Sequence, residues 1–300
     1  MSARPESRTE PASNPMPEPQ NVPLPPDATL QRIAFVPQLA PNQTAITRLR
    51  PPMTGGAILL QDGASSGTKP GDEYAILRVP AKTDDTIAHP DAEVLSLMRN
   101  WVESASREED TPGIFMSFHG VHIHWTPRRC AIYALADRLD ALCKTIAEVT
   151  YYDRELRDVE QLLCSAWPQW EQDLPLAFEF EDRSLAKRPG LRRQFQQLVL
   201  GRARIARLGP VVNAPHLHPP TLASQVNERL RERTHMAHRH ESLGDQLEVF
   251  EWFYEMCGQR VSDLVHTRSS NLLEWVIIIL LLIQLLLSSF EILTATGTTG

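Results

Sequence analysis

An almost unbroken apolar run near the end of the printed sequence constrains the fold of this chain most strongly. Fourteen of the side chains in residues 275–293 are Val, Ile, Leu or Phe. A helix of this length rises about 28 Å, close to the roughly 30 Å thickness of a bilayer's hydrocarbon core. These side chains contribute on the order of −6 kcal/mol to insertion. The run predicts one transmembrane helix; the alternative is a buried core helix, which usually keeps a polar face.

Two residues at the start of this run, Glu274 and Trp275, form a candidate site at the membrane entrance. An indole is typical of the interface between lipid and water, whereas a lone carboxylate in hydrocarbon costs several kcal/mol. We therefore expect Glu274 to lie at the membrane surface. There it would pair loosely with Arg268 or with a neighbouring subunit.

The charges around the run predict its orientation. The anchor is expected over residues 271–293 and is followed by a short tail, residues 294–300, so a tail-anchored protein is expected. Arg260 and Arg268 precede the run, and the tail has no Lys or Arg, which predicts that the bulk of the chain is cytoplasmic. Acidic residues near the amino terminus favour a bacterial inner membrane. In a eukaryote the expectation is the mitochondrial inner membrane.

The front half of the sequence predicts the β part of an α+β fold. Residues 1–29 contain eight prolines and are expected to be a disordered tail. Residues 30–128 are expected to form an α+β subdomain with a small sheet. Its clearest element is a β-hairpin over 114–125, with a tight turn at His119-Gly120. The other expected elements are strands at 32–36, 57–60 and 74–79, the last ended by Pro80, and a helix at 91–107.

The second half of the sequence, residues 129–270, predicts a helical subdomain of long antiparallel helices. Apolar residues recur every three or four positions from Arg129 onward, which predicts a long helix that is ended by Pro168 and Pro175. A second helix is expected over 191–208, followed by a proline-rich loop at 209–220.

The last helical pattern links the predicted soluble domain to the membrane anchor. Thr221 is expected to cap the helix that follows the proline-rich loop. From Leu243 to Leu264 the apolar residues keep a strict four-three spacing, typical of a coiled coil, and the same register extends through Arg268 and Asn271 to Leu285. We expect one helix, or two coaxial ones, running into the bilayer. The same spacing suggests a homo-oligomer that forms through residues 243–285.

Charge is unevenly distributed along the chain. Residues 182–240 hold twelve Lys or Arg against three acids, whereas residues 130–181 carry eleven carboxylates against four basic residues. The basic segment has three interpretations: pairing with the chain's own acidic helix, contact with anionic lipid, or an RNA or ribosome surface. The candidate partner-binding residues are Arg202, Arg204, Arg207, Arg229 and Arg233.

Catalytic, cofactor and metal sites are not expected from the motifs. The four cysteines have no CxxC spacing, and the usual phosphate-loop, dinucleotide, zincin and hydrolase signatures do not occur. His119, His122 and His124 lie close together in the hairpin without an acidic neighbour there. We interpret them as a packed or solvated face rather than a metal site. An enzyme without a recognisable motif is the alternative.

Three stretches of the sequence are similar to one known family. They are the hairpin over 114–125, the Leu273-Glu274-Trp275 start of the apolar helix, and Arg202-Ala203-Arg204-Ile205 before a proline-rich loop. Together they resemble the required-for-meiotic-nuclear-division family, the RMD and Sif-like proteins defined by a domain of unknown function. The resemblance covers about residues 74–293. It implies a membrane-anchored, non-catalytic protein, and mitochondrial relatives support translation at the inner membrane.

The expected function combines the anchor with this resemblance. We expect a membrane-anchored scaffold or regulatory protein, without catalytic residues or a cofactor, that links a cytoplasmic translation or division partner to the inner membrane. The alternative is a membrane-tethered protein that binds RNA or the ribosome. An enzyme is the less favoured third hypothesis.

Overall fold

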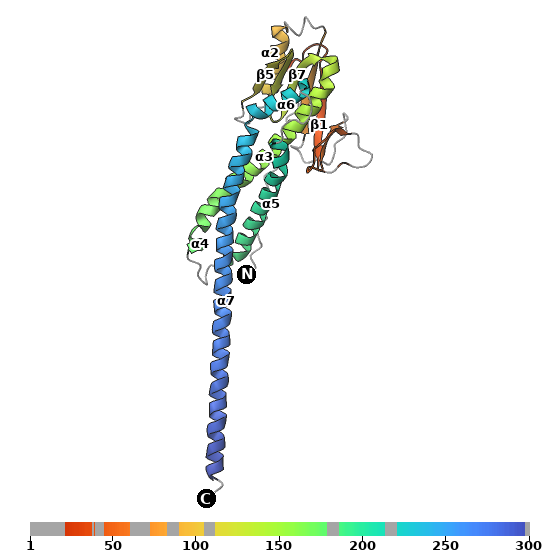
Figure 1. The fold of residues 1–300 in the computed structure, drawn as a ribbon. Coiled ribbons are helices and arrows are strands. Elements are labelled where there is room, and N and C mark those ends of the chain that lie inside the picture. The colour runs from red at the N-terminus through yellow and green to blue at the C-terminus, as the bar shows by residue number, and fades with distance from the viewer. Residues whose placement is uncertain are drawn as a thin grey trace, which may run out of the picture. The chain divides into compact units, whose positions relative to one another are not determined.

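The fold is known from a computed structural model that describes residues 22–37, 39, 45–60, 73–82, 90–104, 112–178, 186–213 and 221–297, with side chains described up to Ser288. It confirms the predicted α+β class, with a sheet in the first half and long helices in the second (Figure 1).

The chain divides into two compact units. The sheet unit comprises Met1–Val159 and Arg204–Ser242, and the helical unit comprises Glu160–Ala203 and Leu243–Gly300. This division crosses the boundaries expected from the sequence, because three long helices each contribute residues to both units.

A mixed sheet forms the centre of the sheet unit. Within the described part of the chain it has seven strands in the order β2-β3-β1-β4-β7-β6-β5. Neighbouring strands are antiparallel except β4 and β7, which are parallel. The strands are β1 (Thr29–Val36), β2 (Ala45–Arg48), β3 (Gly56–Leu60), β4 (Glu73–Ala81), β5 (Ile114–Phe118), β6 (Val121–Trp125) and β7 (Arg129–Leu135).

The predicted β-hairpin is confirmed as β5 and β6. Its register pairs Phe118 with Val121 and Ile114 with Trp125. The two turn residues have positive φ, 45° at His119 and 76° at Gly120, as a primed two-residue turn requires. Glycine adopts this conformation without steric cost, which explains why it takes the second position of the turn.

Strand β7 corrects the prediction that a helix begins at Arg129. Residues Arg129–Leu135 form a strand between β4 and β6, and the helix begins only at Ala136. Every side chain from Arg129 to Ala134 is buried. A strand that is buried on both faces reads as a continuous apolar run, which periodicity alone does not distinguish from part of a helix.

Strand β4 also runs further than predicted, because it passes through Pro80 and ends at Ala81. Its pairing with β1 stops at Arg78, whereas its pairing with β7 continues to Ala81. The missing N–H of Pro80 therefore lies beyond the start of β1, where proline is tolerated as in an edge strand.

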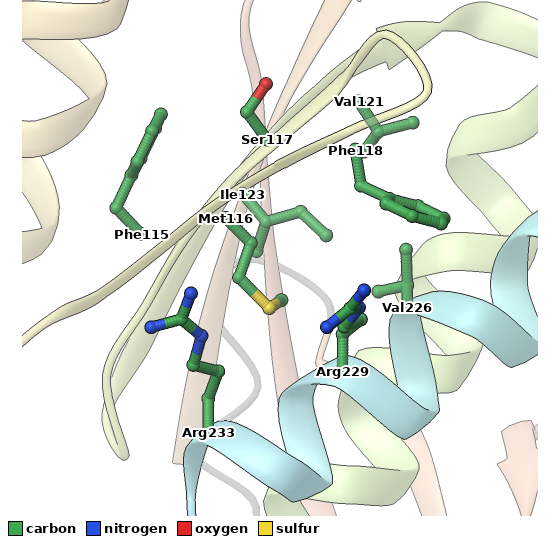
Figure 2. Close-up of a pocket in the computed structure, with 9 residues that line it drawn as sticks. All are labelled: Phe115, Met116, Ser117, Phe118, Val121, Ile123, Val226, Arg229 and Arg233. Carbon is green, nitrogen blue, oxygen red and sulfur yellow. The ribbon is translucent and has the colours of Figure 1, made fainter.

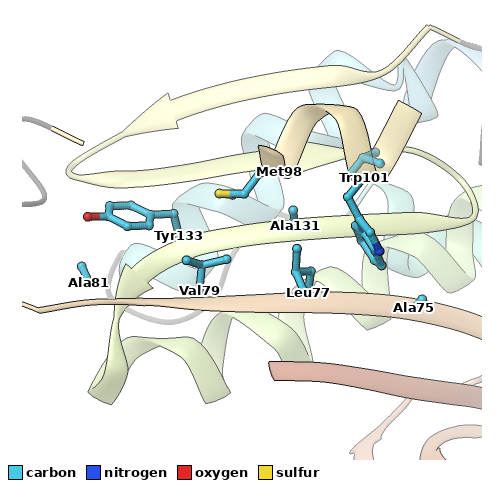
Figure 3. Close-up of a cluster of buried hydrophobic side chains, with 9 residues drawn as sticks. Ala75, Leu77, Val79, Ala81, Met98, Trp101, Ala131 and Tyr133 are labelled. Carbon is cyan, nitrogen blue, oxygen red and sulfur yellow. The ribbon is translucent and has the colours of Figure 1, made fainter. Parts of the chain in front are cut away.

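Helix α2 (Ala92–Glu103) covers one face of the sheet. Asp91 caps it by accepting a hydrogen bond from the Glu93 N–H at 2.9 Å, which confirms the predicted start. The helix ends four residues earlier than predicted, and residues 105–111 lie outside the described part. Its apolar side packs on β4 and β7 (Figure 3). The buried cluster consists of Ala75, Leu77, Val79, Ala81, Met98, Trp101, Val102, Ala131 and Tyr133.

Part of the predicted disordered tail packs against this cluster. Residues 1–21 lie outside the description, but Val22 and Ala28 are half-buried apolar side chains that contact the cluster. The disorder expected for residues 22–29 is therefore wrong, because Val22 and Ala28 add apolar area to the core and Thr29 begins β1.

The other described helices range from four to 62 residues, and two of them continue through proline. They are α3 (Ala136–Asp173), α4 (Pro175–Phe178), α5 (Arg188–Val212), α6 (Leu222–Arg233) and α7 (Met236–Gly297). Pro168 lies inside α3 and Pro210 inside α5, so the helix ends predicted at these two prolines are wrong. Helix α3 does end just before Pro175, as predicted. An internal proline costs roughly 3 kcal/mol, and both helices are packed close to it, since Ala166 and Val211 are buried.

Helix α3 also contributes to the core of the sheet unit. Its residue Thr150 accepts a hydrogen bond from the indole N–H of Trp125 at 2.9 Å. Trp125 pairs with Cys130 of β7, so the two side chains lie on the same face of the sheet. The next residue of β7, Ala131, packs against α2. Because successive side chains of a strand point to opposite faces, Trp125 lies on the face opposite to α2. The sheet is therefore covered on both faces.

Helix α7 is one continuous helix, the first of the two predicted alternatives, one helix or two coaxial ones. Its apolar residues at four-three spacing are buried from Leu243 to Val261. In the helical unit the Phe250 ring lies 4.6 Å from the Trp167 ring, measured between centroids. Gly201 of α5 lies close to two helices, because an added Cβ would be 2.8 Å from Leu162 of α3 and 3.4 Å from Leu247 of α7. Arg202 contacts α7 at Gly244, nearer its start, so α5 runs antiparallel to α7 as predicted.

We predict that Leu77→Ala destabilises the protein by about 2–5 kcal/mol, because it leaves a cavity in the fully buried cluster. The matched control is Leu59→Ala, since Leu59 is a leucine of β3 that is 47% exposed; its expected cost is about 1 kcal/mol or less. Chemical unfolding of the full-length protein in a non-ionic detergent measures both. Equal losses would contradict the assigned core.

Candidate functional site

Two of the candidate arginines share one pocket in the sheet unit. Arg229 and Arg233 lie four residues apart on α6, so both project from the same side of that helix toward the β5–β6 hairpin (Figure 2). The pocket has a volume of about 400 Å³. Met116 and Ile123, both buried, form its apolar floor together with Val226 of α6.

The charge of the two guanidinium groups is only weakly neutralised. Arg229 lies with Cζ 6.0 Å from the centroid of the Phe118 ring, and its Nη1 is 3.5 Å from Glu232 Oε2. Both side chains of this pair are about 60% exposed, so the ion pair contributes little. Arg233 is exposed and has no ion pair with any residue that the structure describes. The pocket thus presents positive charge to solvent.

The chemistry of this pocket suits binding of an anion. A guanidinium stays protonated at physiological pH and offers five N–H donors, which match the oxygens of a carboxylate or phosphate. The apolar floor would accept an aliphatic group beside that anion. Sequence reasoning named Arg229 and Arg233 but missed Met116, Phe118 and Ile123. The spacing of Val226, Arg229 and Arg233 on one side of α6 was the available signal.

The other three candidate arginines do not line this pocket. Arg202, in the helical unit, donates from Nη1 to the Gly244 carbonyl at 2.6 Å. Arg204 and Arg207 are exposed on α5. Burial raises the pKa of Tyr151 well above its usual value, and Arg204 offsets part of that rise by favouring the phenolate. Of the five candidates, Arg229 and Arg233 therefore share the pocket beside the hairpin, and the other three lie outside it.

A buried ion cluster supports the internal-pairing interpretation for one further arginine of the basic segment. Asp153 of α3, whose side chain is 1% exposed, accepts from Arg239 Nη1 at 2.6 Å and from Arg157 Nε at 2.7 Å. Arg239 belongs to the basic segment and Asp153 to the acidic one. The contact closes a loop of 86 residues, so local sequence gave no signal for it.

We predict that Asp153→Ala costs about 3–5 kcal/mol of stability, because it leaves two arginines without their buried partner. Glu232→Ala is the matched control, since it removes a carboxylate from an exposed arginine pair and should change stability by about 1 kcal/mol or less. Unfolding of both variants in detergent measures the difference. A cost below that of Glu232→Ala would contradict the assigned role of Asp153.

The three hairpin histidines occupy different surroundings. His119 is exposed at the turn, whereas His122 and His124 are buried in β6. The His122 ring lies 5.9 Å from the Tyr133 ring and the His124 ring 6.1 Å from the Phe115 ring, measured between centroids. The two buried histidines therefore pack against aromatic neighbours on the sheet. Within the described residues no group of three metal-ligating side chains comes together.

Burial gives His124 an altered titration. Desolvation lowers the pKa of His124 from the usual 6.5, and the positive charge of Arg99 lowers it further. The Glu103 carboxylate offsets part of this lowering, since its Oε1 lies 3.7 Å from His124 Nε2. Below about pH 6.5 the unfolded chain therefore binds a proton more readily than the folded protein does. The folded state loses stability as the pH falls from 6.5 toward the lower folded-state pKa.

We predict that His124→Gln weakens the acid dependence of stability, because the variant lacks this titrating group. Unfolding of the full-length protein at pH 7.5 and pH 5.0 measures the change. His238→Gln, at an exposed histidine of the same unit, is the control and should keep the wild-type dependence. An unchanged dependence in His124→Gln would exclude His124 as a source of acid sensitivity.

The residues of the predicted membrane entrance lie on α7. Trp275 is 65% exposed, and Glu274 is also exposed. The loose pair expected between Glu274 and Arg268 is not observed among the described side chains. Six residues along a helix place two side chains about 120° apart around its axis, so they face different directions.

Comparisons with known proteins give no relative for this chain. No protein-family model, curated protein or solved structure matches it. The interpretation of the pocket and of the apolar helix therefore rests on residues, geometry and charge.

Proposed function

We propose that this protein is a membrane-anchored, non-catalytic adaptor, in which α7 holds the chain at a bilayer and the sheet unit presents a binding surface. One observation carries the proposal. Helix α7 is long and apolar enough to cross a membrane, and none of its most apolar 18-residue window is buried by the residues that the structure describes. The lower part of α7 in Figure 1 is this stretch.

The exposure of this stretch supports lipid as its environment. From Leu272 to Leu287 the large apolar side chains are about half exposed or more. Soluble monomers rarely expose apolar patches larger than a few hundred Å². The backbone of α7 remains helical through residues 271–293, a length of about 34 Å, which suffices for the hydrocarbon core. A core helix of a soluble protein would instead be covered by its own chain.

The residues next to the apolar stretch support the proposed orientation. Arg260 and Arg268 lie on α7 before this stretch and line one pocket with the exposed Phe178. Basic residues flanking a span favour the cytoplasmic side. We therefore place the folded units in the cytoplasm, at an inner membrane, where these arginines would meet anionic headgroups. The resemblance to the RMD family supports a non-catalytic role with a translation or division partner.

Packing limits where self-association through α7 can occur. The four-three residues from Leu243 to Val261 are already buried within the helical unit. A second copy of the chain could therefore use this spacing only from Leu264 onward. We propose residues 264–285 as the segment available for a homo-oligomer.

We predict that the full-length protein stays in the membrane pellet after alkaline carbonate extraction. Ile279→Arg combined with Ile283→Arg should release it, because each central arginine costs about 2.5–3.5 kcal/mol of insertion. Val249→Arg is the matched control: Val249 is an exposed apolar residue of α7 within the helical unit, and this variant should stay in the pellet. Extraction of the unmodified protein by carbonate would overturn the proposal.

A further inference from the structure

Strand β5 leaves one edge of the sheet open. It is the last strand in the sheet order, and within the described chain only β6 pairs with it. Its sequence, Ile-Phe-Met-Ser-Phe, contains neither a charged residue nor proline, the side chains that usually protect an edge strand from pairing. An unprotected edge of this kind is a template for an added strand.

The register of the hairpin identifies the backbone groups that face outward. The two residues that flank a two-residue turn exchange both backbone hydrogen bonds, so the backbone groups of Phe118 bond to those of Val121. The pattern repeats at every second residue, so Met116 and Ile114 also direct their N–H and C=O groups to β6. Phe115 and Ser117 lie between these positions. Their N–H and C=O groups therefore point away from β6, toward the open edge.

Helix α6 forms the other wall of a groove along this edge. Val226, Arg229 and Arg233 face β5 across the pocket described above (Figure 2). A groove between an edge strand and a helix is a recurrent site for peptides that bind by strand addition. In that mode the backbone of the peptide supplies hydrogen bonds, and alternate side chains occupy the groove.

The spacing of the two arginines specifies the ligand. Four residues of helix separate their Cα positions by about 6 Å along the axis. Alternate residues of an extended strand are about 6.8 Å apart and point to the same side. Two carboxylates at positions i and i+2 of an added strand would thus reach Arg229 and Arg233. Residue i+1 would face the opposite side, near the Phe115 side chain, which is 52% exposed.

We propose that β5 and α6 bind an extended peptide with an acidic–apolar–acidic triplet, which pairs with the outward backbone groups of Phe115 and Ser117. This inference deepens the adaptor function by naming the surface and the class of partner, and it rests on that function only for its location at a membrane. A peptide fits better than a nucleic acid because the groove offers backbone pairing and an apolar floor beside only two cations.

The test uses the full-length protein in non-ionic detergent and a fluorescent peptide, Thr-Val-Thr-Glu-Val-Glu-Thr-Val-Thr. We expect saturable binding by fluorescence anisotropy. Arg229→Ala combined with Arg233→Ala should weaken it at least about tenfold, through the loss of two charge-assisted contacts. Arg204→Ala combined with Arg207→Ala, at exposed arginines outside the pocket, should leave it unchanged. Glu232→Ala should strengthen it, because that carboxylate competes for Arg229.

Two further probes separate strand addition from simple charge attraction. A peptide with Gln in place of both Glu should bind weakly. The same acidic peptide with three consecutive N-methylated residues at its centre should also lose binding, since it cannot pair with β5 in either register. Equal binding of the N-methylated peptide would overturn the proposal.

Two other outcomes count against the proposal. Wild-type affinity in the variant that lacks Arg229 and Arg233 would contradict the site. The groove would be assigned to nucleic acid if a single-stranded RNA displaced the peptide and lost more affinity than the peptide does when Arg229 and Arg233 are replaced. Peptide binding is measured in detergent, whereas membrane anchoring is measured by carbonate extraction. A negative result in one experiment therefore does not affect the conclusion from the other. Unchanged unfolding curves of the variants exclude loss of fold.

Discussion

The parallel pairing of β4 with β7 determines where the candidate pocket lies. Parallel neighbours cannot be joined by a tight turn, so the chain between Ala81 and Arg129 must cross from one end of the strands to the other. This connection contains α2, which covers one face of the sheet, and the β5–β6 hairpin, which extends the sheet beyond β7. As a consequence β5 becomes an edge strand. α6, from a distant part of the chain, then completes a groove beside it.

Helix α7 has the same apolar spacing in two different environments. Up to Val261 the spaced residues are buried in the helical unit, whereas from Leu272 the apolar side chains are exposed all round the helix. Spacing alone therefore does not separate a helix packed against its own chain from one that lies in lipid. The distinction comes from the partner helices, because α3 and α5 contact the first part through Trp167 and Gly201.

Elements set by local sequence were predictable, and elements set by distant contacts were not. The hairpin, the Asp91 cap and the Thr221 cap, which accepts from the Ser224 N–H at 3.2 Å, follow from neighbouring residues. Strand β7 was mistaken for helix because its apolar run is short and buried on both faces. The same holds for the site: five arginines were named, but only the packing of α6 against a hairpin about a hundred residues earlier shows which two share a pocket.

Arginines of the basic segment that already bind groups within the chain are less available to a partner. Diffuse attraction to nucleic acid or anionic lipid grows with the number of available cations. In this chain Arg239 is paired with buried Asp153, and Arg202 donates to a backbone carbonyl, so neither is fully available to a partner. Arg229 and Arg233 remain open to solvent, about one helical turn apart on α6 and above an apolar floor. Two cations held in this way discriminate by the spacing of a ligand's anions more than by its total charge, which favours a short, defined acidic motif over an extended polyanion.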